Sequence, residues 1–188
     1  MKRILFLVVV FTGIASLTVS FGLEKFVSYT STTEFCVGCH EMQNSVYVEY
    51  QKTTHYKNAS GVQPSCSDCH VPKGLMPTLY RKLLAVKDVY HHLVGTIDTP
   101  KKFEQRRLMM AQRVWQQLQA SDSQTCRSCH NFDHMDFNKQ RKRASKQHQN
   151  AIKDGSTCID CHKGIAHKAP QEKEQELDDE QNLLELEF

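Results

Sequence analysis

The sequence contains the pattern Cys-x-x-Cys-His four times, as CVGCH, CSDCH, CRSCH and CIDCH. These four motifs use every cysteine of the 188-residue chain, which has eight. The cysteines are Cys36, Cys39, Cys66, Cys69, Cys126, Cys129, Cys158 and Cys161. No cysteine therefore remains for a disulfide bond, a catalytic thiol or a separate metal site.

Each motif has the arrangement that attaches c-type haem to a protein. Two cysteines three residues apart place their sulfurs on one side of a helical turn, where both can form thioether bonds to one porphyrin. The histidine that follows can then bind the iron. Paired cysteines can also hold zinc, but zinc gives no reason for a histidine after every second cysteine. We therefore predict four covalently bound haem c groups.

The composition supports a fold that is organised around these cofactors. Hydrophobic residues make up 39% of the chain, and many of them belong to the apolar N-terminus. The rest of the chain is too poor in apolar side chains to bury a sizeable core by itself, whereas four porphyrins supply large apolar faces. We expect a mainly α and irregular, haem-centred multihaem cytochrome c with little or no sheet.

The N-terminus predicts a transmembrane anchor over residues 4–23. Ile4–Leu23 is a run of twenty residues without a charge, which is long enough to span a bilayer as a helix. A signal peptide is the alternative, with cleavage after Ser20 and a secreted, soluble product. Signal peptides usually have a shorter apolar region, so the length favours a retained anchor.

The charges beside the anchor predict its orientation. Lys2 and Arg3 precede the apolar run, and the positive-inside rule places residues 1–3 in the cytoplasm. The cytochrome domain, residues 24–170, is then expected in the periplasm, outside the bacterial inner membrane.

The spacing of the motifs indicates an internal repeat. The first and second motifs are about as far apart as the third and fourth, and the gap between the two pairs is about twice as long. A histidine precedes the second motif of each pair at a similar distance, His55 in the first pair and His148 in the second. This recurrence indicates two duplicated dihaem units, at about 34–75 and 124–168. Both histidines are candidate sixth ligands of an iron; the alternative is a surface histidine in a loop.

A helical connector, residues 76–120, is predicted between the two units. Apolar residues recur at helical spacing from Leu75 to Leu93. A second helix is predicted from Pro100 to about Leu118, with Thr99 as its N-cap. Three further histidines receive no role from these patterns: His91, His92 and His134.

The C-terminal segment, residues 171–188, differs from the rest of the chain in charge. It holds eight acidic residues and one lysine, although the whole chain has a formal net charge of +3. We expect this segment to be a solvated, disordered acidic tail. The remaining chain is basic, which suits an anionic membrane surface or an acidic partner, and no feature indicates a nucleic acid as partner.

Several segments together resemble the NapC/NirT family of membrane-anchored tetrahaem cytochromes c. They are FCVGCHEM, THYKNASGV, CSDCHVPKG, RKLLAVKDVY and CIDCHKGIAH, after one N-terminal anchor. The resemblance implies a quinol dehydrogenase that oxidises membrane quinol, either menaquinol or ubiquinol, and passes electrons to a periplasmic terminal reductase. The segment GTIDTPKKFEQRRLMMAQRVW is similar to the branch that serves nitrate reductase.

Other functions remain open beside this one. The reductase could instead act on nitrite or an amine oxide, although no further cytochrome domain follows the fourth motif, as one does in the amine-oxide branch. The chain could be an electron shuttle without quinol chemistry, or a multihaem catalyst that itself reduces nitrite or hydroxylamine. Whether the protein counts as an enzyme is therefore open.

The resemblance also implies a set of iron ligands. Relatives with CxxCHxM bind the first iron through the methionine, here Met42, in place of His40. The other motifs would supply proximal histidines, and three more histidines match family positions for distal ligands. The proximal set is His70, His130 and His162, and the distal set is His55, His148 and His167. Many relatives read CHxPH where this chain has Lys73, so a sixth ligand for the first haem is not implied.

A quinol site near the first haem is implied by the same resemblance. Asp88 matches an aspartate that covers the distal side of this haem in a relative. Arg81 lies two helical turns earlier, on the same face, and Lys82 is adjacent. A carboxylate there could accept a quinol proton and a cation could bind a quinone oxygen. The alternative from spacing alone is a solvated helical ion pair.

Overall fold

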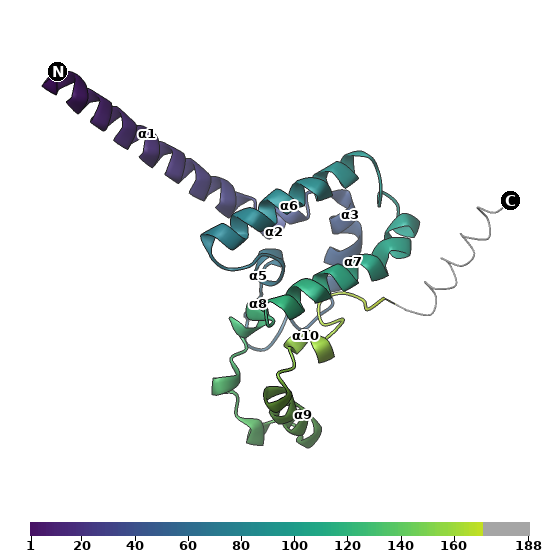
Figure 1. Ribbon diagram of the computed structural model, residues 1–188. Coiled ribbons are helices and arrows are strands. Elements are labelled where there is room, and N and C mark those ends of the chain that lie inside the picture. The colour runs from purple at the N-terminus through teal and green to yellow at the C-terminus, as the bar shows by residue number, and fades with distance from the viewer. Residues whose placement is uncertain (171–188) are drawn as a thin grey trace.

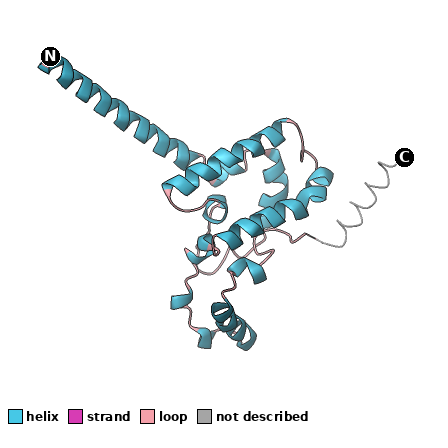
Figure 2. Cartoon of the chain, in the orientation of Figure 1, coloured by secondary structure: helices cyan, strands magenta, loops and turns pink. Residues whose placement is uncertain are grey.

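The computed structural model describes residues 1–170, and the predicted acidic tail lies outside the described residues. The described chain is built from helices and loops and contains no strand (Figure 2). The α-helices are α1 (Lys2–Tyr29), α2 (Thr33–Cys36), α3 (His40–Met42), α4 (Val48–Tyr50), α5 (Cys66–His70), α6 (Leu75–Leu93), α7 (Pro100–Ala120), α8 (Gln124–Arg127), α9 (Lys142–Asp154) and α10 (Cys158–Cys161). The expected mainly helical fold is confirmed.

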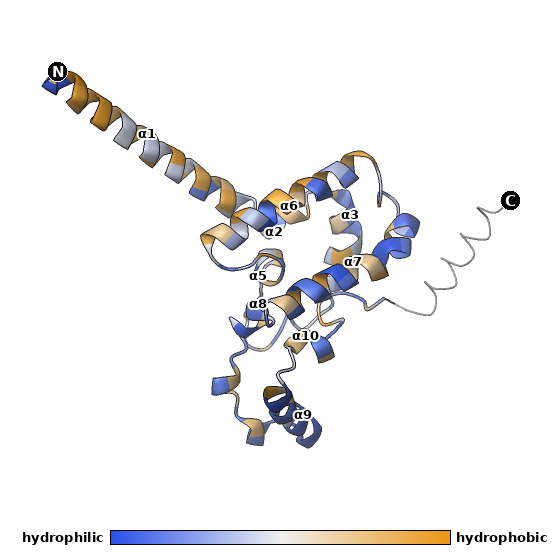
Figure 3. Ribbon diagram, in the orientation of Figure 1, coloured by the Kyte–Doolittle hydropathy of each residue, from blue (hydrophilic) through white to orange (hydrophobic). Residues whose placement is uncertain are grey.

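Helix α1 projects away from the rest of the molecule (Figure 1). None of its 28 residues is buried, and its surface is apolar over most of its length (Figure 3). It is the one helix of the described chain that is long and apolar enough to cross a membrane. It continues beyond the predicted span of 4–23, because no helix-breaking residue follows Leu23 before Thr30 ends the helix.

The two long helices of the connector form where the sequence predicts them. Helix α6 ends before Gly95, which has a left-handed φ of 66° that glycine adopts without strain. Helix α7 begins at Pro100, and the side chain of Thr99 caps it by accepting a hydrogen bond from the backbone N–H of Lys102. These two helices frame the upper part of the domain in Figure 1.

The second and fourth Cys-x-x-Cys-His motifs start with the same local structure. Ser65 forms a capping box with Asp68 at the start of α5, and Thr157 forms one with Asp160 at the start of α10. Each box satisfies backbone N–H groups at a helix start. The two motifs occupy equivalent places in the two predicted dihaem units, and their shared cap fits a duplication.

The apolar core of the domain is very small. In residues 1–170 the buried apolar side chains are Tyr50, Phe103 and Ile159. Polar contacts join the segments instead, and the largest set surrounds Arg107, whose residue is 6% exposed. The scarcity of core side chains expected from composition is therefore present in the fold.

Candidate haem-iron centres

Three pairs of histidine side chains face one another across the domain. The ring centroids are 6.1 Å apart for His70 and His167, 6.2 Å for His55 and His130, and 5.9 Å for His148 and His162. Each pair joins a motif histidine to one of the three predicted distal histidines. Two imidazoles that bind one iron, each with its nitrogen about 2 Å from the metal, place their centroids about 6 Å apart. The three pairs therefore have the spacing that bis-histidine haem requires.

The pair at the second motif has one ring fixed by the backbone. The Nδ1 of His167 donates a hydrogen bond to the carbonyl of Val46 at 3.1 Å. A histidine that binds a metal commonly donates its other ring N–H in this way, which sets the tautomer and the ring orientation. The Nε2 of His167 is then the nitrogen available to iron, and the ring is inclined at only 29° to that of His70.

The pair at the third motif connects the two halves of the chain. His55 comes from the first predicted dihaem unit and His130 from the second, and their rings are inclined at 88°. The Nδ1 of His55 is buried without a hydrogen-bond partner in the described part of the chain. The sequence placed His55 inside the first unit but did not show which motif histidine it faces.

The pair at the fourth motif has one ring on α9. The Nδ1 of His148 bonds to the side-chain oxygen of Gln140 at 2.8 Å, again leaving Nε2 toward the partner ring. His148 and His162 are inclined at 36°, and Phe132 packs 5.9 Å from His148. The hydrogen-bonding role of Gln140 carries no signal in the sequence.

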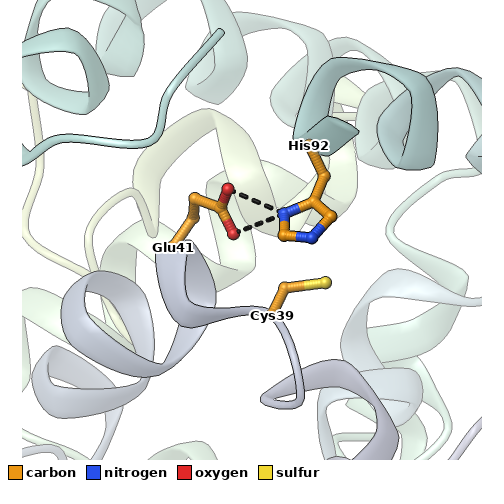
Figure 4. A group of neighbouring side chains, drawn as sticks. All are labelled: Cys39, Glu41 and His92. Carbon is orange, nitrogen blue, oxygen red and sulfur yellow. Dashed lines mark hydrogen bonds and ion pairs between the residues drawn. The ribbon is translucent and has the colours of Figure 1, made fainter. Parts of the chain in front are cut away.

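The first motif is arranged differently, because the carboxylate of Glu41, beside the motif, contacts His92 (Figure 4). His92 of α6 contacts both oxygens of Glu41 through Nδ1, at 2.8 and 2.9 Å. The Nε2 of His40 lies 3.3 Å from the same carboxylate. The rings of His40 and His92 are 5.8 Å apart, but Glu41 bridges them. This pair does not fit a bis-histidine iron.

Glu41 is the clearest site residue that sequence reasoning missed. Its side chain is 3% exposed, and one oxygen lies within 4.8 Å of the Cys39 sulfur and a nitrogen of His92. Burial acts to raise the pKa of Glu41, but hydrogen bonds from its own backbone and from His92 hold the pKa below its ordinary value. The available signals were a carboxylate directly after a haem motif and a histidine of α6, His92, that had no assigned partner.

The predicted quinol-site residues all lie on α6. The Nη1 of Arg81 is 3.9 Å from Oδ2 of Asp88, whose side chain is 69% exposed. The Nε of Arg81 is buried without a hydrogen-bond partner in the described chain. Burial lowers the pKa of Lys82, and the nearby Cys36 thiol opposes that shift. The structure thus brings Lys82 to the first motif and leaves Asp88 open to the surroundings.

Neighbouring motifs in the chain are also neighbours in space. A hydrogen bond with Cys66 raises the pKa of the Cys36 thiol. Burial and then the charge of Cys126 raise the pKa of Cys69 to about 11. Burial and then the charge of Cys158 raise the pKa of Cys126. The attachment sites therefore follow one another in sequence order, with each next to its successor.

The remaining polar residues near the motifs have local partners or lie at the surface. Lys73 pairs with Asp68 at 2.7 Å. His91 bonds to Thr96 at 3.0 Å, and His134 is exposed in a short 3-10 helix. Of the histidines left unassigned by the sequence, His92 is thus the one that reaches a motif.

Comparison with known proteins finds similar cytochromes c. A model of the NapC/NirT cytochrome c family, N-terminal region, matches residues 1–172. The cytochrome c-type protein NapC of Escherichia coli K12 is 53% identical over 155 residues, covering 82% of this chain and 76% of that protein. A putative tetraheme cytochrome-c type protein of Allochromatium vinosum is 53% identical over 154 residues, covering 82% and 81%. The denitrification system component NirT of Stutzerimonas stutzeri is 46% identical over 158 residues, covering 84% and 79%. No solved structure matches.

Proposed function

The chain belongs to the NapC/NirT cytochrome c family, and from this premise we propose that it carries four haem c groups, oxidises membrane quinol and passes the electrons to a periplasmic reductase. Membership itself makes it a membrane-anchored electron-transfer protein with covalently bound haem c. The proposal concerns the number of haems, the donor and the acceptor.

The residues of the four motifs support four haems. Eight cysteines provide two thioether sulfurs for each porphyrin. Three histidine pairs have the bis-imidazole spacing, and on this basis we propose His167 as a ligand of the second haem, His55 of the third and His148 of the fourth. For the first haem we propose Met42 as ligand, because Glu41 occupies the Nε2 of His40, the nitrogen that a motif histidine gives to iron.

The observation that carries the proposed donor is the exposed apolar surface of α6. None of its residues is buried, and its His92 reaches Glu41 beside the first motif. Eight of its apolar side chains belong to residues that are more than half exposed: Leu75, Met76, Tyr80, Leu83, Val86, Val89, Tyr90 and Leu93. Exposed apolar patches of this kind mark protein or membrane contacts. A surface of this kind beside the first motif, which follows the anchor helix in the chain, supports a donor that arrives from the lipid.

The polar residues of α6 supply the chemistry that quinol oxidation needs. Asp88 is an exposed carboxylate that can accept a quinol proton. The guanidinium of Arg81 lies beside it and can hydrogen-bond a quinone oxygen. The haems, when bound, supply one-electron carriers whose potentials the protein sets through axial ligands, hydrogen bonds and burial. Quinol gives two electrons and two protons, so a proton acceptor beside the first carrier is required.

The orientation and the acceptor are part of the same proposal. Lys2 and Arg3 favour a cytoplasmic N-terminus, which places the haem domain in the periplasm. The 53% identity to NapC favours a periplasmic nitrate reductase as acceptor. Relatives named NirT and TorC, at 46% and 50% identity, keep other periplasmic reductases as the alternative.

The test uses the full chain, with its haems, in lipid nanodiscs that contain reduced menaquinone or ubiquinone analogues. Haem reduction is followed by visible absorption, and Asp88→Asn is expected to slow it about tenfold or more with all four haems retained. Lys87→Gln, an exposed neighbour on α6, is the matched control.

Two outcomes would contradict the proposal. If quinols do not reduce haems that dithionite reduces fully, the chain is a shuttle without quinol chemistry. If the purified chain turns over nitrite or hydroxylamine without a partner, it is a catalyst in its own right. Mass analysis of the purified chain counts the porphyrins independently of either result.

A further inference from the structure

Helix α9 presents a strongly basic surface on the part of the molecule farthest from α1 (Figures 1 and 3). The segment 139–153 contains six basic residues and no acidic one, and all six are exposed: Lys139, Arg141, Lys142, Arg143, Lys146 and Lys153. We call these six residues the α9 basic face.

The basic face and the fourth histidine pair belong to opposite sides of the same short helix. Lys142, Lys146 and Lys153 recur at the spacing of one outer face. Ala144 and His148, one turn apart, are less exposed and lie on the inner side, where His148 meets His162 at 5.9 Å. A molecule that contacts the basic face is therefore separated from the fourth iron centre by little more than the width of one helix.

These cations have few intramolecular partners. Of the six, only Lys139 forms an ion pair in the described chain, with Asp136 at 3.7 Å. Basic side chains that do join segments of the fold are paired more closely, as in Lys73 with Asp68 at 2.7 Å and Arg107 with Glu49 at 2.6 Å. The charge of α9 is therefore not used to hold the fold together.

The position of the charges also costs helix stability. Arg141 is the N-cap residue, Lys142 and Arg143 open the helix, and its first turn has no acidic residue. The N-terminus of a helix carries partial positive charge and favours anions, so cations there are unfavourable. A cluster that opposes the helix dipole and lacks partners is better explained by an external anionic partner than by folding.

We propose that the α9 basic face docks an acidic protein surface that surrounds the redox centre of the electron acceptor, so that electrons leave through the His148–His162 site. This inference rests on the proposed electron-relay function, and it identifies the surface through which the electrons leave the protein. Charges at the rim of an interface act mainly on the rate of encounter and on its salt dependence, which suits a transient redox complex. Helix α1 and the α9 basic face then lie at opposite ends of the molecule, and the four adjacent Cys-x-x-Cys-His motifs connect them.

The experiment reverses the charge of three of these residues in the full haem-loaded chain, as K142E/R143E/K146E. Acidic residues at a helix start are favourable, so the helix is retained, and the low-spin signal of the fourth haem verifies it. The matched control is K101E/R106E/R113E, three exposed positions on α7 with the same change in charge. Both proteins are reduced with dithionite, so quinol chemistry is not involved.

Two small oxidants test the electrostatics of the exit without any partner protein. Oxidation by the ferricyanide trianion at low salt should slow about tenfold in the α9 variant, whereas oxidation by a tris(phenanthroline)cobalt(III) trication should accelerate. Both differences should disappear at about 0.5 M salt, where charges are screened within a few ångströms. The α7 control should change each rate less than twofold. Equal effects in the two variants would overturn the proposal.

Electron transfer to purified periplasmic nitrate reductase then tests the docking itself. At low salt the α9 variant should lose about tenfold or more in rate, with a shallower salt dependence than the unaltered chain. If the unaltered chain does not reduce this enzyme, the proposed acceptor is wrong. The measurements with the small oxidants still test whether electrons leave the protein at the α9 basic face. If removal of residues 171–188 raises the ferricyanide rate tenfold, and the charge reversal slows oxidation only in that shortened chain, the chain's own acidic segment occupies the face and the proposal is wrong.

Discussion

The carboxylate of Glu49 accepts two hydrogen bonds from the guanidinium of Arg107, at 2.6 and 2.9 Å. The same carboxylate accepts a third from the backbone N–H of Lys168 at 2.8 Å, and Arg107 also donates to the carbonyl of Lys168. One buried arginine thus joins α4, α7 and the C-terminal stretch. Because His167 precedes Lys168 in that stretch, the contact fixes the backbone that presents a proposed ligand of the second haem.

We predict that Arg107→Met destabilises the domain by about 3 kcal/mol, since removing one partner of a buried pair leaves the other uncompensated. His167 should also lose its fixed position, which would broaden or shift the low-spin signal of the second haem. Denaturant unfolding and electron paramagnetic resonance measure the two effects. Arg106→Met, at an exposed position of the same helix, should change neither. If the variant is destabilised but the signal of the second haem is unaltered, Arg107 does not position the ligand His167.

The same network predicts a pH dependence of stability. A hydrogen bond from Arg107 holds the pKa of Glu104 below its ordinary value, against the opposing effect of burial. A carboxyl whose folded-state pKa is depressed stabilises the fold above its unfolded pKa of about 4.3 and loses that contribution as pH falls through the folded value. Glu104→Gln should therefore lower the unfolding free energy at neutral pH, and the deficit should shrink below about pH 4. A deficit that is constant from pH 7 to pH 3 would contradict the prediction.

The ring geometry predicts different magnetic signatures for the three proposed bis-histidine centres. The rings of His55 and His130 are nearly perpendicular, at 88°, which produces a highly anisotropic low-spin ferric signal. The rings of His70 and His167 are inclined at only 29°, which produces a rhombic signal. Low-temperature electron paramagnetic resonance of the oxidised protein should show both types. Replacement of His55 by alanine should remove the highly anisotropic signal and leave the rhombic ones.

The first haem is expected to behave differently from the other three. Met42→Leu should abolish the sulfur-to-iron charge-transfer band of a methionine-ligated haem, whereas His40→Ala should leave it in place. Glu41→Gln removes the charge that attracts His40 and should weaken the band, as His40 competes for the iron. Absence of the band from the unaltered protein, or a band that persists in Met42→Leu, would show that Met42 is not the ligand.

The local features of this fold were predictable because they depend on residues close together in the chain. The apolar N-terminal helix, the helix from Leu75 to Leu93 and the cap at Thr99 each follow from local periodicity and capping chemistry, and the structure has them. The motif cysteines were identifiable for the same reason, since a thioether site needs two sulfurs at a fixed short spacing.

The pairing of distant residues was not predictable from one sequence. His55 lies closer in the chain to the second motif than to the third, yet it faces His130. The contact of Glu41 with His92 spans 51 residues, and that of Glu49 with Arg107 spans 58. Such contacts depend on how the loops and connector helices bring distant parts of the chain together. Neither the periodicity nor the spacing of residues in the sequence determines that arrangement.

The near absence of a hydrophobic interior has a consequence for how the protein is made. A polypeptide with only Tyr50, Phe103 and Ile159 as buried apolar side chains in its described part has little to collapse around as it leaves the translocon. It should stay extended and accessible to the haem-attachment machinery, so that porphyrin ligation and compaction occur as a single step of biogenesis. Cells starved of haem should therefore degrade the nascent chain rather than accumulate a partly loaded intermediate.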